Sequence, residues 1–94
     1  MSYNLHKIYG PIISDDESNK IFSFIELELE SKKVVEINFE GVVAMSTKSA
    51  KRIFGTLYSK LNPEKFYERI HITNASKTLQ EIIYDAITNY IDNN

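Results

Sequence analysis

The sequence predicts a small single-domain α/β protein with a mostly parallel sheet of three to five strands covered by helices. Strand-like and helix-like segments alternate three times along the chain, which is typical of parallel strands joined by right-handed crossovers. The length of 94 residues and the hydrophobic fraction of 43% suit one compact core. We therefore expect residues 1–94 to form a single domain.

The clearest strand–turn–helix unit lies in the middle of the chain. Val34–Phe39 is a β-branched and aromatic run that predicts a buried strand, and it is the best candidate for the central position in the sheet. Gly41 marks a break, and a helix is predicted from about Thr47 to Leu61. Its apolar residues recur at helical spacing: Ala50, Ile53, Phe54, Leu57, Tyr58 and Leu61.

The N-terminal third predicts a strand followed by a helix. Tyr3–Tyr9 alternates roughly as a strand does, with Leu5 facing inward. Ser14 and Glu17 have the spacing of a capping box, so we expect a helix that continues to about Ser31. The second half of this segment also alternates like a strand, but its Glu and Leu residues favour a helix. The expected inward residues are Ile21, Phe24, Ile25 and Leu29.

The C-terminal third predicts one more strand and the last helix. Arg69–Thr73 has strand character, and Asn74–Ser76 then opens a helix. The apolar face of this helix comprises Leu79, Ile82, Ile83, Ala86, Ile87, Tyr90 and Ile91. Pro11 and Pro63 lie at the connections between elements. The expected core of the domain is Ile37, Phe39, Ile53, Phe54, Leu57, Ile72, Ile82, Ile83 and Ile87.

Composition and charge argue against several classes of protein. The formal net charge is −2 and the cationic residues are scattered, so the basic stripe of a nucleic-acid binder is missing. The absence of cysteine leaves no disulfide or thiolate site and fits a reducing cytoplasm. No apolar run approaches the length of a membrane span, and the first residues lack the apolar core of a signal peptide.

The sequence offers no pattern for catalysis or metal binding. His6 and His71 each lack a second ligand at suitable spacing, so we expect neither a metal nor a cofactor. No nucleophile–base pair and no glycine-rich phosphate loop can be assembled, so we expect no enzyme activity. Asp15, Asp16 and Glu17 fit the positive end of a helix rather than a pair of catalytic carboxylates.

The middle unit resembles the STAS-like domains of unknown function, small bacterial proteins akin to the STAS domains of anti-sigma factor antagonists. The resemblance lies in the strand end at residues 38–42, the hydroxyl-rich turn at 46–50 and the Phe54-Gly55 pair of the following helix. Residues 70–76 also resemble the family's final strand, which runs into Asn-x-Ser before a helix. The likeness covers roughly residues 34–92 and implies the STAS-like fold.

In anti-sigma factor antagonists this turn carries Asp-Ser-Ser/Thr-Gly, and the Ser after the Asp is phosphorylated by a partner kinase that is also the anti-sigma factor. The resemblance places that Asp at Ser46 and the phosphorylated hydroxyl at Thr47, with Lys48 and Ser49 at the next two positions. The acid and the glycine of the motif are therefore absent. The implied partner is another protein, such as an anti-sigma factor, an ATPase-type kinase or another regulator.

The turn and helix at residues 44–58 hold the candidate site. Ser46 is a natural N-cap, and a phosphate on Thr47 or Ser46 would lie at the positive helix end beside Lys48 and Lys51. Gly55 interrupts a good helix, which indicates close approach of another backbone within the domain or from a partner. The candidate partner-binding residues are Met45, Ser46, Thr47, Lys48, Ser49, Lys51, Arg52 and Gly55.

Two functional hypotheses follow. The first is a non-catalytic protein-interaction or regulatory module that docks a partner through residues 44–58 and is open to regulation by phosphorylation. The second is a domain that binds a small ligand, a nucleotide or another anion, at the carboxyl ends of its strands, where helix N-termini gather. For both hypotheses we expect a cytoplasmic protein that contacts neither nucleic acid nor membrane.

Overall fold

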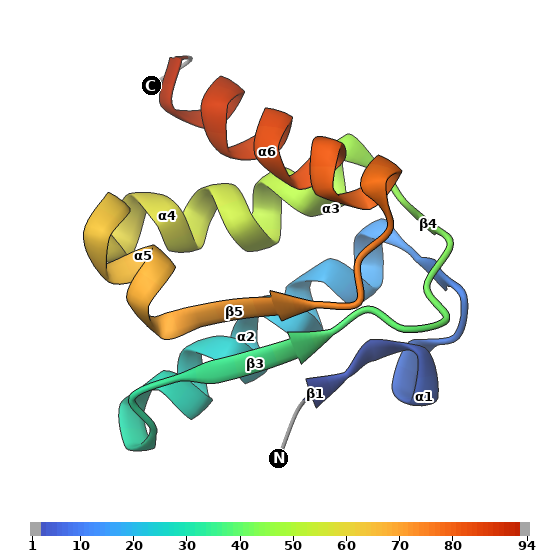
Figure 1. Ribbon diagram of the computed structural model, residues 1–94, viewed down its shortest axis with the longest axis horizontal. Helices are drawn as coiled ribbons and strands as arrows, with labels where there is room; N and C mark the ends of the chain where they lie inside the picture. Colours follow the sequence, from blue (N-terminus) through green and yellow to red (C-terminus); the bar gives the residue numbers. More distant parts are fainter. Residues whose placement is uncertain (1–2, 93–94) are drawn as a thin grey trace.

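A sheet of three parallel strands lies at the centre of the fold (Figure 1). The computed structural model describes residues 3–92, and the side chains of residues 90–92 lie outside this description. The strand order is β1 (Tyr3–Asn4), β3 (Val35–Asn38), β5 (Ile70–Thr73). Ile37 of β3 lies in register with Tyr3 on one side and Ile72 on the other. The predicted parallel sheet and the central position of its middle strand are confirmed.

A second, two-stranded parallel sheet joins the two long connections and was not predicted. It consists of β2 (Ile12–Ile13) and β4 (Ala44–Met45). The carbonyl of Pro11 accepts hydrogen bonds from the N–H groups of Val43 and Ala44, at 2.8 and 3.3 Å. Each strand is only two residues long, too short to leave a periodic pattern in the sequence.

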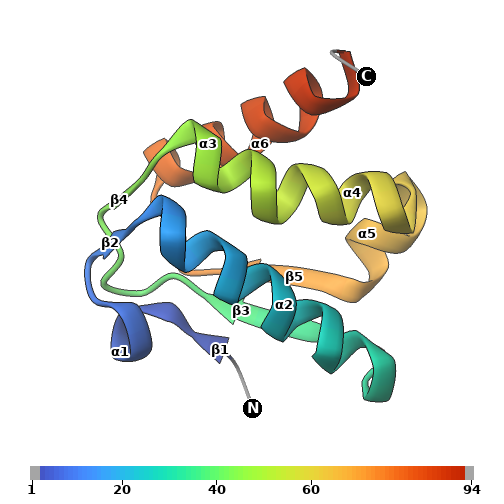
Figure 2. The same cartoon turned by 180° about the vertical axis from the view of Figure 1, so that it is seen from behind.

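The helices cover one face of the main sheet, and the opposite face is open (Figures 1 and 2). Along β3, Val35 and Ile37 are buried while Glu36 between them is exposed. The same alternation places His71 of β5 on the open face. The helices are α1 (Leu5–Tyr9), α2 (Asp15–Ser31), α3 (Thr47–Ala50), η1 (Lys51–Gly55), α4 (Thr56–Leu61), α5 (Pro63–Arg69) and α6 (Lys77–Asp92).

The hydrophobic core lies between the sheet and the helices. Most of the residues expected there are buried: Ile37, Phe39, Ile53, Phe54, Leu57, Ile83 and Ile87. Ile72 and Ile82 are partly buried and pack against the margin of this core. Within α2, Ile21 and Ile25 are buried as predicted and Leu29 is partly buried. The predicted inward positions of Tyr90 and Ile91 lie outside the described side chains.

Two predictions for the N-terminal third are wrong. Residues 5–9 form α1 and not a strand, because the side chain of Asn4 caps a helix by accepting from the N–H of Lys7 at 3.1 Å. Leu5 is nevertheless fully buried, as expected. Phe24 does not face the core: its side chain is 39% exposed and its ring stacks on Tyr3, with 4.0 Å between the ring centroids.

Two features of the second half were also missed. The helix predicted from Thr47 to Leu61 has those bounds, but its middle turn, η1, is π-helical. The connection after it contains α5, which begins at Pro63. Asn62 supplies the cap by accepting from the N–H of Lys65 at 3.1 Å, and proline suits the first helical position. Among the described residues, no helix is long and apolar enough to span a membrane.

Replacing Leu57 should show whether this helix packs as described. The Leu57 side chain is 1% exposed. Leu57→Ala should therefore lower the free energy of unfolding by about 2–5 kcal/mol, as buried large-to-small changes do. The control Ser59→Ala alters an exposed position of the same helix and should change it by less than about 0.5 kcal/mol. A loss below about 1 kcal/mol for Leu57→Ala in urea unfolding would contradict the packing.

Candidate functional site

The small β2–β4 sheet brings two helix N-termini together. Ile13 and Met45 are paired in register, and each is the last residue of its strand. The next residues, Ser14 and Ser46, are the N-caps of α2 and α3. Two helices that lie far apart in the sequence therefore begin side by side, as the packing of α2 against α3 shows. This pairing places the hydroxyl-rich turn against the start of α2.

The carboxylate of Asp15 joins the two helix starts. Its Oδ1 atom accepts from the hydroxyl of Ser46 at 2.6 Å and from the hydroxyl of Ser49 at 2.8 Å. The Ser46 oxygen also accepts from the backbone N–H of Ser49 at 3.0 Å, so it caps α3 as predicted. Because each hydroxyl carries one proton and directs it at Asp15, the 3.1 Å contact between the two serine oxygens carries no further hydrogen bond.

Electrostatics favour the ionised form of Asp15. The hydrogen bonds from Ser46 and Ser49 hold the pKa of the Asp15 carboxyl below its usual range, and the positive charges of Lys48 and Arg52 lower it further. The start of α2 is also supported by the predicted capping box. In this box Ser14 N–H donates to the Glu17 carboxylate at 3.0 Å, and Glu17 N–H donates to the Ser14 hydroxyl at 3.2 Å.

The structure divides the candidate partner-binding residues into two groups. Met45, Ser49 and Gly55 are buried, so these residues lie beneath the site and do not reach its surface. Gly55 lies in η1, which packs against α2 and α6. This contact within the domain accounts for the close approach inferred from the sequence. The remaining candidates lie at the surface: Ser46, Thr47, Lys48, Lys51 and Arg52.

The two candidate phosphorylation sites have different surroundings. Both side chains are exposed, but the hydroxyl of Ser46 is held by Asp15 and by the start of α3. The hydroxyl of Thr47 forms no hydrogen bond with any described residue, and its side chain lines a hollow at the surface. Thr47 is therefore the more accessible acceptor, whereas a modification of Ser46 would have to break the contact with Asp15.

A shallow hollow lies over the first turns of this helix. Its volume is about 540 Å³, and we call its lining residues the basic surface: Thr47, Lys48, Lys51, Arg52 and Thr56. The two ion pairs among the described residues, Lys32–Glu28 and Lys60–Glu26, involve none of these cations. Arg52 Nη1 donates to the side-chain oxygen of Asn19 at 3.0 Å, which is a neutral partner.

The π-helical turn shapes this surface. It spans Lys51 to Gly55 and therefore contains two of the three cations. The hydroxyl of Thr56 lies 3.4 Å from the carbonyl of Lys51, to which it donates across the widened turn. In proteins, π-helical segments occur mostly as single turns within α-helices, and they are often found at functional sites.

Within residues 3–92 no group of three or more His, Asp or Glu side chains is placed to hold a metal ion. The two histidines lie apart from the basic surface. His6 lies on α1 against Gly41, where an added Cβ atom would come within 2.7 Å of its ring. His71 is exposed on the open face of the main sheet.

Sequence reasoning missed three residues of the site. Asp15 was interpreted only as an acid at a helix start, and it lies 31 residues from Ser46 in the sequence. Asn19 accepts a hydrogen bond from Arg52, and Thr56 lines the hollow. No local motif could have identified Asp15 and Asn19, because the pairing of β2 with β4 brings α2 beside the turn. Thr56 lies on the same helix as Lys51, five residues further along, so helical spacing could have placed it near this lysine.

We call the contact of Asp15 with Ser46 and Ser49 the junction of the two helix starts. Asp15→Asn tests whether the negative charge of Asp15 stabilises this junction. Asparagine keeps an oxygen that can accept from both serines, so the substitution removes mainly the negative charge. Because the pKa of Asp15 is lowered in the folded state, its charge stabilises the protein at neutral pH and loses this effect as the pH falls through the lowered pKa. The wild type should therefore melt at a higher temperature than the variant at pH 7, and the gap should close in acid.

Asp16→Asn is the matched control, since Asp16 lies in the same helical turn and its side chain forms no hydrogen bond with a described residue. It should lower the melting temperature at pH 7 by less than Asp15→Asn does. Equal shifts for the two variants at every pH would show that the junction adds nothing beyond the helix dipole.

Comparison with known proteins identifies the family of the chain. A family model described as a STAS-like domain of unknown function matches residues 18–80, a span that includes the candidate turn and most of the helical layer. No curated protein and no solved structure matches the chain. The parallel strands in small sheets covered by helices fit a STAS-like fold. The chain therefore belongs to the family of STAS-like domains of unknown function.

Proposed function

We propose that this protein is a non-catalytic interaction module that docks a regulatory partner protein through the basic surface. The observation that carries the proposal is the set of three cations, Lys48, Lys51 and Arg52, that line one hollow. None of them forms an ion pair with a described residue, although the carboxylate of Asp15 interacts electrostatically with Lys48 and Arg52. Three like charges so close together repel one another and are better stabilised by an acidic surface. The proposal includes the cytoplasmic location expected from the cysteine-free sequence.

The rigid support beneath this surface suits docking. Met45 and Ser49 are buried, and Ser49 is tied to Asp15. The exposed side chains therefore project from a backbone fixed by packing and hydrogen bonds, which limits the entropy lost on binding. The partner surface that fits is one rich in carboxylates. An anti-sigma factor or an ATPase-type kinase is the kind of partner that the family resemblance suggests.

Phosphorylation would act on the same surface. A phosphate on Thr47 would add about 1.5 to 2 negative charges beside Lys48 and Lys51. These cations would then be neutralised within the chain, so an acidic partner would lose its attraction. Thr47 suits this role better than Ser46, because its hydroxyl is exposed and forms no hydrogen bond with a described residue.

A second candidate function is the binding of a small anion such as a nucleotide. The observation that favours it is the lining of the hollow, which consists only of cationic and hydroxyl side chains. Thermal shift separates the two functions. A large shift with nucleotide that is absent with candidate partner proteins would favour the small ligand, and the opposite result would favour docking.

Charge reversal tests the basic surface. Lys51→Glu should weaken binding to a carboxylate-rich partner by about tenfold or more at low salt, and the loss should shrink as salt is added. The control Lys65→Glu changes an exposed lysine of α5, away from the hollow, and makes the same change in net charge. Binding should be measured by titration calorimetry at several salt concentrations. Equal losses for both variants would mean that only net charge matters.

Thr47→Asp and Ser46→Ala separate binding from stability. Thr47→Asp should leave the melting temperature almost unchanged, because an acid is tolerated in the first turn of a helix, while it weakens or redirects partner binding. Ser46→Ala should cost about 1 kcal/mol of stability through the lost cap and spare binding per folded molecule. If Thr47→Asp retains every partner of the wild type in a pull-down, the turn is only a helix start.

The absence of catalysis is part of the proposal. The candidate residues form no nucleophile–base pair beyond the contacts of Ser46 and Ser49 with Asp15. The Ser46 oxygen is already occupied as a helix cap, and Ser49 is buried. Turnover that persists through purification and disappears on replacing a hydroxyl or histidine side chain would overturn this part.

A further inference from the structure

One edge of the main sheet is open to pairing. β5 pairs with β3 on one side and with no described strand on the other. The N–H of Phe39 donates to the carbonyl of Thr73 at 2.9 Å, so the backbone polar groups of Thr73 face β3. Because these groups alternate in direction along a strand, those of Ile72 face away from the sheet. Neither the N–H nor the C=O of Ile72 has a partner among the described residues.

The free edge of β5 carries none of the residues that commonly block pairing. β5 is four residues long, and its sequence Ile-His-Ile-Thr contains no proline, lysine or acidic residue. Proteins often place such residues on an edge strand to prevent unwanted pairing.

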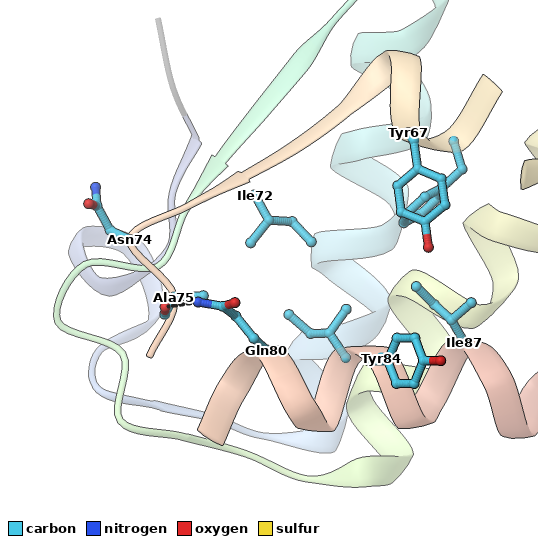
Figure 3. Close-up of a pocket in the computed structure, with 9 residues that line it drawn as sticks. Tyr67, Ile72, Asn74, Ala75, Gln80, Tyr84 and Ile87 are labelled. Carbon is cyan, nitrogen blue, oxygen red and sulfur yellow. Dashed lines mark hydrogen bonds between the residues drawn. The ribbon is translucent and has the colours of Figure 1, made fainter. Parts of the chain in front are cut away.

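A groove of about 330 Å³ lies beside β5 on the helical side of the sheet, between this strand and α6 (Figure 3). Ile72 points from the strand towards α6, which contributes Ile83 and Ile87 to the opposite wall. One end of the groove is flanked by Tyr67 and Tyr84, whose side chains are 60% and 64% exposed. At the other end, the Gln80 side chain donates to the carbonyl of Ala75 at 2.8 Å.

We propose that the β5 edge binds an extended peptide segment of another protein as a fourth strand, with apolar side chains at alternate positions. An extended backbone is the partner whose own N–H and C=O groups match the free groups of Ile72. Every second side chain of the added strand would face the helical side of the sheet, as the side chain of Ile72 does. There it would meet Ile83, Tyr84 and Ile87.

The groove favours a single strand over a second copy of this chain. A lone extended segment that pairs with Ile72 would lie beside β5 in the plane of the sheet, about 5 Å away as neighbouring strands do, with alternate side chains on the side of α6. The β5 edge of a second copy is flanked by its own α6, which would have to share the space beside the first α6. This interaction surface is separate from the basic surface and does not depend on the function proposed for it.

The test begins with a phage-displayed library of random peptides, about nine residues long, selected against the full chain so that each peptide exceeds the length of a typical strand. We expect the selected peptides to share alternating apolar residues. On binding, NMR should show that the amide proton of Ile72 becomes protected from exchange with solvent. Methylation of alternate backbone nitrogens of the peptide should abolish binding.

Variants of the chain complete the test. Ile72→Pro removes the N–H that faces away from β3 and no bond to β3, a change that edge strands tolerate, and it should weaken peptide binding by about tenfold or more. Tyr84→Lys leaves β5 unaltered and should weaken binding through the groove wall. The control His71→Asn, on the open face, should bind as the wild type does.

Selection that yields no peptides, or peptides that bind Ile72→Pro and Tyr84→Lys as tightly as the wild type, would overturn the proposal. If Ile72→Pro fails to fold, the binding of peptides to Tyr84→Lys and of methylated peptides to the wild type still tests the proposal. A dimer in sedimentation velocity that Tyr84→Lys dissociates would assign the edge to a second copy and would equally contradict it.

Discussion

The pairing of β2 with β4 is the constraint on which the arrangement of the site depends. Each strand ends directly before a serine N-cap, so the register of Ile13 with Met45 fixes where α2 and α3 begin relative to each other. Asp15 then links the two starts by accepting from Ser46 and Ser49. A short parallel strand pair and one carboxylate thus hold the starts of α2 and α3 in place relative to each other. A longer unpaired loop would not do so, because it would leave the two helix ends free to move.

The residues around this junction fall into two groups, those that hold the turn in place and those that can contact a partner. The residues that hold the turn in place are buried or already hydrogen-bonded, whereas Thr47, Lys48 and Arg52 are exposed and Lys51 is half-buried at the rim of the hollow. The turn itself contains no acidic residue, and α2 supplies the carboxylate of Asp15 that lies against Ser46.

The sequence predicted those parts of the fold that rest on repeated local patterns. The periodic helices, the central strand and the caps at Ser14 and Ser46 all follow from spacing within a few residues. The turn as candidate site was predicted for the same reason. Asp15 as its partner could not be predicted, because strands of two residues show no periodicity. α1 and α5 were missed although Asn4 and the Asn62-Pro63 pair are recognisable helix starts.

The most direct test of this account is an NMR titration of the Asp15 carboxyl carbon in the wild type and in Ser46→Ala. If the serine hydroxyls hold the carboxylate as described, its pKa in the wild type lies below the usual range of an aspartate. It should then rise towards that range when the Ser46 hydroxyl is removed. An Asp15 that titrates at the same pH in both proteins would contradict the junction and with it the explanation of how the turn is positioned.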